Sequence, residues 1–297
     1  MSKRKVSIVI TNYNGIDLLK KHLPKVFEAS RQKINNIIEV VVVDDASTDG
    51  SVDFLKDNYS EVRVIVHKKN LRFAETVNSG FREAKGELVC LLNNDVSPAT
   101  NFLRSTIALF ENEDVFGVSL GELDYSWSKG IFQDGFVEHA SGKRTKKHHS
   151  TFWISGGSGL FRKSMWKKLS GMDSKLFSPF YWEDLDISYR AMKRGWKLLW
   201  DPSAKVTHEH ESTNKAFDDV YRSRIQERNQ LLFIWKNITS TRMFRQHLRG
   251  LIKRSLKHPG YLRIVLMSFV KIRWLIPARI SEKKKSIISD ESIFAKF

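Results

Sequence analysis

Polar side chains follow three apolar runs in the first third of the chain, each at the point where a buried strand would end. Asp95 and Asp45 come after two of these runs, and Thr11 and Tyr13 come after the third. In an open α/β sheet, ligands bind at the edge formed by the carboxyl ends of the strands. Carboxylates at that edge can accept a hydrogen bond from a base or bind a divalent cation. The sequence therefore predicts a nucleotide site there.

Asp45 also has a simpler explanation. Together with Asp44 and Asp49 it could cap the next helix or form a turn, because short acidic side chains bind free main-chain N–H groups. The neighbouring Thr11 and Tyr13 favour the nucleotide interpretation, in which the Asp45 carboxylate accepts a hydrogen bond from the base.

Asp95 is the predicted ligand of a hard cation, Mg²⁺ or Mn²⁺, although it could simply begin the next helix. Such cations prefer oxygen ligands and need few from the protein when a diphosphate supplies the others. His208 follows a short predicted strand and is a candidate second ligand. A lone histidine is more often structural, and His210 is a second candidate nearby; we prefer His208.

Glu183 and Asp184 begin a predicted helix directly after an aromatic segment that ends at Trp182. Acidic residues are favoured at a helix N-terminus by the macrodipole, so both could be structural. Alternatively, a carboxylate here is a general base that removes a proton from an attacking hydroxyl. The adjacent aromatic rings would then partly desolvate the carboxylate and stack on a sugar ring. Spacing alone does not choose between these two interpretations.

Alternating strands and helices must position these residues. The apolar runs are rich in β-branched residues and predict strands buried on both faces, as in a parallel sheet flanked by helices. Right-handed crossovers then give a doubly wound, Rossmann-like sheet. The strands are expected over residues 6–11, 38–43, 62–67, 87–92 and 115–120, and the helices over residues 16–29, 51–58, 74–84 and 99–110.

The rest of the chain is less regular. Residues 121–150 have no clear period and predict loops or short antiparallel strands. After them we expect a turn at 156–159 that feeds a strand, a helix over 183–194, short strands over 197–200 and 205–207, and helices from residue 216 onward.

The composition of the 297 residues, 41% of them hydrophobic, allows one large α/β domain with an appendage, or two modest domains. The single cysteine, Cys90, lies inside an expected strand, which excludes a disulfide within the chain and fits a reducing compartment. The N-terminal strand is too short for a signal-peptide core, and no apolar run is long enough to span a membrane.

The net charge of +17 is concentrated near the C-terminus, where residues 242–297 hold fourteen Lys and Arg against three acidic residues. Residues 143–149 form a second basic cluster. Such patches attract phosphates, anionic lipid or nucleic acid, although a solvated basic surface explains either one as well. Within residues 259–280 the basic residues alternate with aliphatic residues and Trp274. This favours a helix docked on an anionic membrane face, and the alternative is a helix packed on the rest of the protein.

Several well-known sites are excluded. The first strand lacks Gly-x-Gly-x-x-Gly, and no Gly-x-x-x-x-Gly-Lys-Ser/Thr string occurs, so neither a dinucleotide fold nor a P-loop is expected. One cysteine excludes tandem Cys/His zinc sites, and no serine stands in a Gly-x-Ser-x-Gly elbow.

Four motifs, in a specific order and spacing, resemble those of a known family. They are VSIVITNYN, VVDDASTDGS, LLNND and WEDLDISYR, at residues 6–14, 42–51, 91–95 and 182–190. Together they resemble the inverting family 2 glycosyltransferases of the GT-A fold, especially the branch with bacterial rhamnosyl- and galactofuranosyltransferases. The resemblance covers about residues 5–212.

The resemblance implies roles for individual residues. Thr11 and Tyr13 would line the nucleotide pocket, and Asp45 would bind the base. Asp95 would be the metal-binding carboxylate of an Asp-x-Asp-like motif whose first position is Asn93 here.

Asp184 would be the catalytic base, and His208 would complete the site for Mn²⁺ or Mg²⁺. Gly156 and Gly157 fall where the family brings main chain close to the donor sugar.

The resemblance also bears on three other residues. Trp182 and Glu183 are assigned to the donor or acceptor sugar. Residues 70–73 read Asn-Leu-Arg-Phe, where the family often has Asn-x-Gly-Phe, so Arg72 could contact donor phosphate or merely be exposed.

The same resemblance predicts the domain organisation. Residues 1–212 would form an α/β GT-A catalytic domain with a mostly parallel, Rossmann-like sheet flanked by helices. Its nucleotide-binding half would cover about residues 1–120 and its acceptor half residues 121–212. Residues 213–297 would form a helical, basic C-terminal appendage.

The implied reaction is a single in-line displacement from a nucleotide sugar to a hydroxyl of a glycan or polyprenyl-linked glycan, as in cell-surface polysaccharide synthesis. A carboxylate that faces a base N3–H suits UDP- or dTDP-sugars, and guanine remains conceivable. We expect a cytoplasmic protein, peripheral on the inner membrane.

Two other classes compete with this interpretation. A basic nucleic-acid-binding protein is disfavoured because the charge is concentrated in the tail while the strand ends are acidic. A catalytically inactive GT-A fold that acts as a binding module is disfavoured by the presence of Asp45, Asp95 and Asp184.

Overall fold

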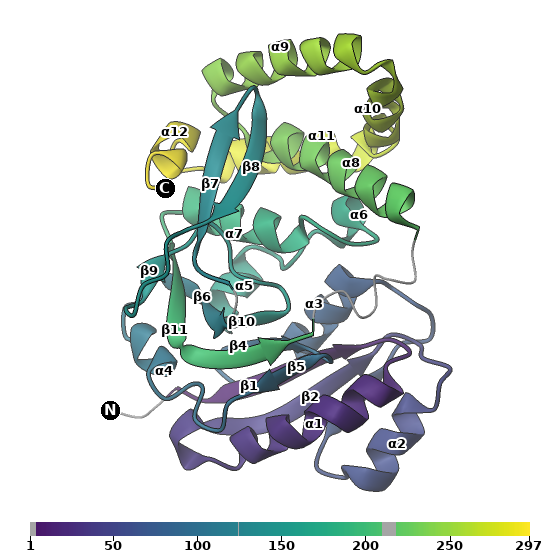
Figure 1. The fold of residues 1–297 in the computed structure, drawn as a ribbon, viewed down its shortest axis with the longest axis vertical. Coiled ribbons are helices and arrows are strands. Elements are labelled where there is room, and N and C mark those ends of the chain that lie inside the picture. The colour runs from purple at the N-terminus through teal and green to yellow at the C-terminus, as the bar shows by residue number, and fades with distance from the viewer. Residues whose placement is uncertain (1–3, 124, 210–217) are drawn as a thin grey trace.

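The structure, a computed structural model, describes residues 4–123, 125–209 and 218–297. In Figure 1 the longest axis of the molecule is vertical. The first strands and helices of the chain lie at the lower end and the C-terminal helices at the upper end. The predicted α/β fold is confirmed.

The described residues form one mixed sheet of nine strands in the order β3-β2-β1-β4-β10-β6-β11-β5, with β9 paired to β11. Six strands run in one direction, because β1 is parallel to β2 and β4, β2 is parallel to β3, β6 is parallel to β11, and β10 is antiparallel to both β4 and β6. The strands are β1 (Val6–Asn12), β2 (Ile37–Asp44), β3 (Arg63–Val66), β4 (Leu88–Asn93), β5 (Val96–Pro98), β6 (Val115–Glu122), β9 (His149–Ser150), β10 (Ser158–Arg162) and β11 (Lys197–His208).

Helices cover the sheet, and a hairpin projects from it toward the C-terminal helices (Figure 1). The hairpin pairs β7 (Ser128–Gln133) with β8 (Phe136–Ser141), as the prediction of short antiparallel strands allows. The helices before residue 200 are α1 (Ile16–Ser30), η1 (Lys33–Asn35), α2 (Ser51–Asn58), α3 (Phe73–Glu83), α4 (Thr106–Leu109), α5 (Lys163–Lys168), α6 (Ser174–Phe177) and α7 (Glu183–Lys193).

Both faces of the sheet are buried. Successive side chains of a strand point to opposite faces, and in β1 Val9 packs in one hydrophobic cluster while Ile8 packs in the other. Phe81 of α3 belongs to the cluster of Val9, and Leu23 of α1 to that of Ile8. Burial on both faces explains why the strands read as nearly continuous apolar runs.

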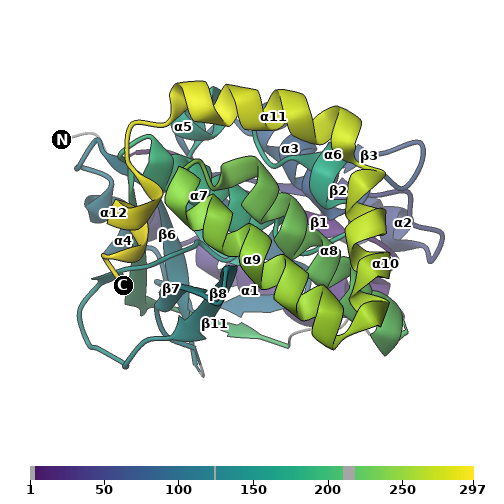
Figure 2. The same cartoon turned by 90° about the horizontal axis from the view of Figure 1, so that it is seen from above.

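The C-terminal helices share one of these cores. They are α8 (Asp219–Asn237), α9 (Thr241–Lys257), η3 (Pro259–Tyr261), α10 (Leu262–Phe269), α11 (Ile272–Lys285) and α12 (Asp290–Phe294). Phe233 of α8 and Leu275 of α11 are buried in the same cluster as Val9. Asp290 of α12 accepts hydrogen bonds from Lys193 Nζ and the Tyr189 hydroxyl of α7, both at 2.7 Å. Figure 2 shows α9, α10 and α11 arranged around α8.

The helix expected over residues 99–110 is wrong in its length, because only α4 is helical and turns precede it. Asn35 explains the difference. Its Nδ2 donates to the carbonyl of Thr100, and its Oδ1 accepts the main-chain N–H of Leu103. A buried side chain from a distant segment thus takes the polar groups that a longer helix would have used.

The two short strands expected over residues 197–200 and 205–207 form one strand, β11, with an irregular register between Asp201 and Lys205. The Asp201 carboxylate accepts the main-chain N–H of Ser203, which bends the strand at this point. The predicted interruption thus corresponds to an irregular register, and the chain continues as one strand in the same sheet.

Candidate active site

A cavity of about 510 Å³ lies at the carboxyl ends of β1, β2 and β4. Polar side chains were expected to meet at this edge of the sheet. All the predicted site residues except Trp182 and His208 line the cavity: Thr11, Tyr13, Asp45, Arg72, Asn93, Asp95, Gly156, Gly157, Glu183 and Asp184.

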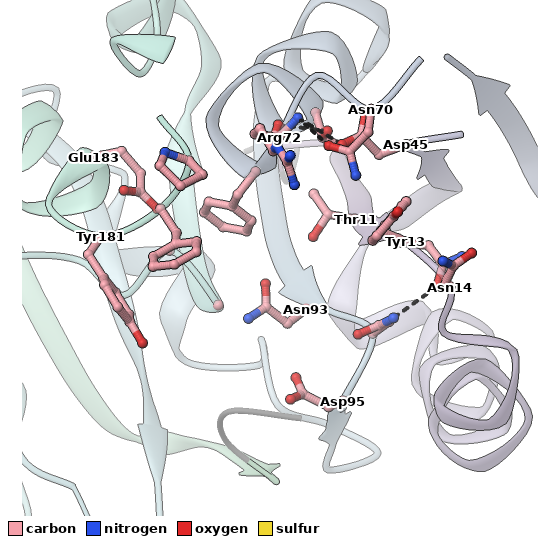
Figure 3. Close-up of a pocket in the computed structure, with 18 of the residues that line it drawn as sticks. Thr11, Tyr13, Asn14, Asp45, Asn70, Arg72, Asn93, Asp95, Tyr181 and Glu183 are labelled. Atoms are coloured by element: carbon pink, nitrogen blue, oxygen red, sulfur yellow. Dashed lines mark hydrogen bonds between the residues drawn. The ribbon is translucent and has the colours of Figure 1, made fainter. Parts of the chain in front are cut away.

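The cavity has two walls (Figure 3). Asp45 and Arg72 lie on one side, Tyr181 and Glu183 lie on the opposite side, and Asp95 lies between them. The first wall comes from the residue after β2 and the loop before α3, and the second comes from the start of α7 and the segment that precedes it.

Asp45 is buried, and its carboxylate holds the loop before α3. Oδ1 accepts the main-chain N–H of Leu71 at 2.7 Å and lies 2.8 Å from Nδ1 of His67, and Oδ2 accepts the main-chain N–H of Arg72 at 2.8 Å. An ionised carboxylate offers about four acceptor positions. Asp45 can therefore hold this loop and still accept a hydrogen bond from a ligand.

Arg72 adopts a backbone conformation that favours glycine, with φ of 73°. A non-glycine residue in such a conformation costs about 1–3 kcal/mol. The predicted departure from Asn-x-Gly-Phe thus falls at a strained position. Arg72 is exposed, and it is the only Lys or Arg among the described residues that line the cavity.

Asn12 was not predicted, although it stands between Thr11 and Tyr13. Its Nδ2 donates to Asp44 Oδ2 at 2.9 Å, and its Oδ1 accepts from Nδ2 of Asn94 at 2.8 Å. These bonds join the ends of β1, β2 and β4. The alternation of β1 is the sequence signal for this role, because it places Asn12 on the buried face of Ile8 and Ile10.

Asp95 lies beside His208, which is outside the lining of the cavity. The Nε2 atom of His208 is 3.1 Å from Asp95 Oδ1, and its Nδ1 atom is 3.3 Å from Glu122 Oε1. Burial lowers the pKa of His208, but the hydrogen bonds and charges of Asp95 and Glu122 outweigh this effect and raise the pKa to about 9. The alternative ligand, His210, lies outside the described residues.

The residues around Asp95 fit a hard cation. The Oδ1 atom of Asn93 is buried and has no hydrogen-bond partner in the described part of the chain, so an unpaired amide oxygen lines the cavity together with the Asp95 carboxylate. The described residues contain no group of three or more His, Cys, Asp or Glu side chains arranged for a metal ion. A cation would therefore need further ligands, such as phosphate oxygens, and His208 would have to release its proton to bind it.

Gly156 and Gly157 bring main chain against the site. The N–H of Gly156 donates to Asp184 Oδ2 at 3.1 Å. A Cβ atom at Gly157 would lie 2.8 Å from both Asn93 Nδ2 and His208 Cε1. A side chain at this position would therefore require the side chains of Asn93 or His208, beside Asp95, to shift.

Glu183 and Asp184 occupy the first turn of α7, where Glu183 is buried and Asp184 is half-buried. Burial and then the negative charge of Asp184 raise the pKa of Glu183 to about 8. Burial also raises the pKa of Asp184, but hydrogen bonds from the N–H groups of Gly156 and Leu185 act in the opposite direction. The charge therefore belongs on Asp184 while Glu183 keeps its proton, which suits Asp184 to the role of a base.

Trp182 does not face the cavity, contrary to its assignment to a sugar. It is buried, and its ring centroid lies 5.2 Å from that of Phe233 in the core. Tyr181 and Phe180 line the cavity instead. The side chains of this aromatic segment that reach the cavity are thus the two that directly precede Trp182.

This arrangement is the GT-A fold of nucleotide-sugar glycosyltransferases. The structure resembles the crystal structure of GalNAc-T7 with UDP, GalNAc and Mn²⁺, with a TM-score of 0.65 at 15% identity, over 88% of this chain and 57% of that one. It also resembles the mannosyltransferase PcManGT from Pyrobaculum calidifontis in complex with GDP-Man and Mn²⁺, with a TM-score of 0.58 at 15% identity, over 95% and 88% of the two chains.

The family follows from the sequence. Residues 7–169 match the family model described as glycosyl transferase family 2, which is more than half of the chain. The protein belongs to this family.

Curated relatives share parts of the chain. The probable glycosyltransferase YdaM of Bacillus subtilis is 23% identical over 221 residues, 70% of this chain and 51% of that protein. The undecaprenyl-phosphate 4-deoxy-4-formamido-L-arabinose transferase of Aeromonas hydrophila is 32% identical over 127 residues, 41% of this chain and 39% of that protein. The chain spans about a quarter to a half of the length of its first curated relatives. Among the described residues, none of the helices combines the length and the hydropathy needed to cross a bilayer.

Proposed function

We propose that this protein transfers a sugar from a nucleotide sugar to a hydroxyl group, with inversion at the anomeric carbon. The observation that carries the proposal is that Asp45, Asp95 and Asp184 line one cavity in a protein of family 2. Asp45 directly follows β2, Asp95 follows β4, and Asp184 lies in the first turn of α7. A single sugar nucleotide in the cavity would use all three carboxylates.

The donor nucleotide would lie against the wall that Tyr13 and Asp45 form. Tyr13 is 39% exposed and its ring would offer a surface for base stacking, while Asp45 would accept a hydrogen bond from the base. A carboxylate acceptor suits the N3–H of uracil or thymine, so UDP- and dTDP-sugars are favoured. The guanidinium of Arg72 would bind a phosphate oxygen of the donor.

A divalent cation, Mn²⁺ or Mg²⁺, would be held by Asp95 and His208, with Asn93 beside them. When bound, such a cation neutralises negative charge on the leaving nucleotide diphosphate. The structures of GalNAc-T7 and PcManGT both contain Mn²⁺, which supports this choice.

Asp184 would act as the base. Its carboxylate takes the proton of the acceptor hydroxyl while the hydroxyl oxygen forms a bond to the anomeric carbon. The bond from that carbon to the diphosphate oxygen breaks on the opposite face, and the electron pair leaves with the nucleotide diphosphate. The N–H of Gly156 holds the carboxylate oriented for this step.

The relatives and the C-terminal helices support a class of acceptor. Matches to undecaprenyl-phosphate sugar transferases support a glycan or polyprenyl-linked glycan acceptor, and hence work at a membrane surface. The outer face of α9 carries Leu248, Ile252 and Leu256, which are 44%, 61% and 78% exposed. Their spacing of four residues makes one apolar stripe, and Arg245 and Arg249 lie on the same side of the helix.

The next two helices repeat this pattern. Leu266 and Val270 are exposed at the end of α10, and Ile276 and Ile280 are exposed on α11. Apolar stripes among basic residues suit the surface of an anionic bilayer. We therefore place the protein on the cytoplasmic face of the inner membrane, as a peripheral protein with no nucleic acid partner.

A thermal-shift measurement tests the proposal. The full chain is heated with UDP-, dTDP- and GDP-sugars, each with and without Mn²⁺. A donor at a concentration of about 100 times its Kd stabilises the folded state by about 2.7 kcal/mol. We expect a rise in Tm with a UDP- or dTDP-sugar that depends on Mn²⁺, and release of the nucleotide diphosphate when the sugar is transferred. No shift with any of these nucleotide sugars would refute the proposal.

A further inference from the structure

The wall opposite the nucleotide residues is aromatic. Phe180 and Tyr181 line the cavity beside Asp184, with their ring centroids 4.9 Å apart and their planes at 78°. We propose that Phe180 and Tyr181 form the acceptor subsite, which takes a pyranose ring, and that Asn229 of α8 is the residue that positions it. This inference rests on the proposed function and adds the residues that bind and position the acceptor sugar.

The position of the two rings favours the acceptor over the donor. Figure 3 shows Tyr181 and Glu183 across the cavity from Asp45 and Arg72. A nucleotide diphosphate bound between Asp45 and Asp95 leaves its sugar facing the opposite wall. An in-line displacement requires the attacking hydroxyl to approach from the side away from the diphosphate, which is the side of Tyr181.

The chemistry of this wall suits a sugar ring. A pyranose presents an apolar C–H face and a rim of hydroxyl groups, and aromatic rings pack well against such a face. The buried Phe180 and the half-buried Tyr181 supply the apolar surface. Asp184 and Glu183 line the cavity beside them, within the reach of hydroxyl groups on the rim.

The main chain of this segment is unusual. Tyr181 has φ of 72° and Trp182 has φ of 75°, a region that residues with large side chains rarely adopt. Two such residues in succession persist only when their surroundings hold them in place. Their conformation turns Tyr181 toward the cavity and Trp182 into the core.

Asn229 provides the restraint. Its side chain is fully buried, and its Nδ2 atom lies 2.9 Å from the carbonyl oxygens of Phe177, Phe180 and Tyr181. Its Oδ1 atom accepts hydrogen bonds from the guanidinium of Arg228, at 3.0 and 2.8 Å. One amide therefore binds three carbonyls of the segment that carries the aromatic rings.

Arg228 extends the restraint. Its guanidinium also donates to the carbonyl of Ser178 at 2.7 Å, at the start of the same segment. Two adjacent residues of α8 thus fix the segment that leads into Glu183 and Asp184. The C-terminal region, through α8, sets the geometry of the acceptor side of the cavity.

Saturation-transfer NMR on the full chain tests the subsite. The probes are methyl β-D-glucopyranoside, methyl β-D-galactopyranoside and methyl α-L-rhamnopyranoside, each with Mg²⁺ and UDP, dTDP or GDP. We expect ring protons of at least one glycoside to receive saturation from the wild type. Tyr181→Ala should weaken its binding about three- to tenfold, and Tyr181→Phe should preserve it. No glycoside signal, or an equal signal with Tyr181→Ala, would overturn the subsite.

The nucleotide signals separate this inference from the proposed function. If no nucleotide receives saturation from the wild type, the proposed function fails. If a nucleotide binds but the glycoside signal is the same in the wild type and in Tyr181→Ala, only the acceptor subsite fails.

The role of Asn229 is tested against Asn237, another buried asparagine of α8, whose Nδ2 donates to Asp186 at 2.8 Å. Asn229→Ser and Asn237→Ser should both lower Tm, but only Asn229→Ser should reduce the glycoside signal while nucleotide binding is kept. Asn229→Asp keeps the shape and the bonds from Arg228, loses the amide donor, and should reduce the signal in the same way. An equal reduction by Asn237→Ser, or none by the Asn229 variants, would overturn the positioning role.

Discussion

The Asp45 carboxylate accepts the main-chain N–H of Arg72 at 2.8 Å, although Arg72 has a φ of 73°. The same carboxylate is the proposed acceptor for the base. One buried acid therefore connects the position of the nucleotide with a strained loop. That loop carries the only Lys or Arg among the described residues that line the cavity. Strain at this position is consistent with a function for the guanidinium, because a glycine would adopt the same φ without steric strain.

Replacing Arg72 by glycine should separate stability from binding. Relief of the strained φ stabilises the folded protein by about 1–3 kcal/mol. The greater freedom of glycine in the unfolded chain offsets about 0.5–1 kcal/mol of this gain. We expect Arg72→Gly to raise Tm and to weaken nucleotide-sugar binding about tenfold, through loss of a charge-assisted hydrogen bond to phosphate. Calorimetric titration with UDP and dTDP measures the affinity. Arg72→Ala, which keeps the strain, should bind equally weakly without the gain in Tm; unchanged affinity in both variants would exclude the phosphate contact.

The two carboxyl groups that begin α7 should respond differently to the same change. Asp184→Asn removes the proposed base, so sugar transfer should fall by about 10²- to 10⁴-fold while nucleotide binding is kept. The amide in Glu183→Gln is neutral, like the protonated carboxyl of Glu183 in the folded protein. The rate of sugar transfer should therefore stay within about tenfold of that of the wild type. Rates of nucleotide diphosphate release in the presence of an acceptor measure both. Near-normal turnover in Asp184→Asn would remove Asp184 from this role.

Glu183 should also make stability depend on pH. Burial and the charge of Asp184 raise its pKa from the ordinary value of 4.5 to about 8. Between these values the folded protein keeps a proton that the unfolded chain has released, so the free energy of unfolding falls as the pH rises. The effect is at most about 1.4 kcal/mol per pH unit. Glu183→Gln cannot lose a proton, and its free energy of unfolding should fall less between pH 5 and pH 8. Urea unfolding at each pH measures this free energy. If it falls equally with pH in the two proteins, Glu183 is not held buried and protonated.

Removing the Asp95 carboxylate should abolish the effect of the cation. We expect Asp95→Asn to bind nucleotide with the same affinity in Mn²⁺ and in EDTA, because a neutral amide is a poorer ligand for a hard cation. The wild type should lose nucleotide affinity when Mn²⁺ is removed. Glu122→Gln is the control, since Glu122 contacts His208 but does not line the cavity. This variant should keep its dependence on Mn²⁺.

The fold was predictable where local signals agree with the final packing. β1, β2 and β4 are bounded apolar runs, and their burial on both faces makes those runs nearly continuous. The side chains that follow them had to meet at one edge, which is why Asp45 and Asp95 could be named. The helix expected over residues 99–110 failed for the opposite reason, since Asn35, far away in sequence, binds the main chain of that segment.

The wall of the cavity that Phe180 and Tyr181 form was not predictable in the same detail. Which of Tyr181 and Trp182 faces the cavity depends on two positive φ values, and these depend on Asn229, 48 residues beyond Tyr181. No local pattern encodes that contact. Similarly, the strain at Arg72 appears only once Asp45 has been placed against its N–H group.

The outer face of α9 gives the last prediction, on membrane binding. Replacing Leu248, Ile252 and Leu256 by serine removes exposed apolar surface without opening the core, whereas truncation of the tail would remove buried residues such as Leu275. Each CH₂ group withdrawn from water contributes about 0.8 kcal/mol, so the triple variant should bind vesicles at least tenfold more weakly.

Flotation with vesicles of phosphatidylglycerol and phosphatidylethanolamine measures this binding, and vesicles of phosphatidylcholine test the need for anionic lipid. The control variant Ile38→Ser/Val66→Ser changes two residues that are 45% and 52% exposed and lie on β2 and β3. These two strands pair with each other, and Figure 1 shows β2 at the end of the molecule away from α9. It should float like the wild type. If the triple variant floats equally well, the stripe does not contact lipid; if it instead converts a dimer to a monomer in size-exclusion chromatography, the stripe is a contact between two copies of the chain.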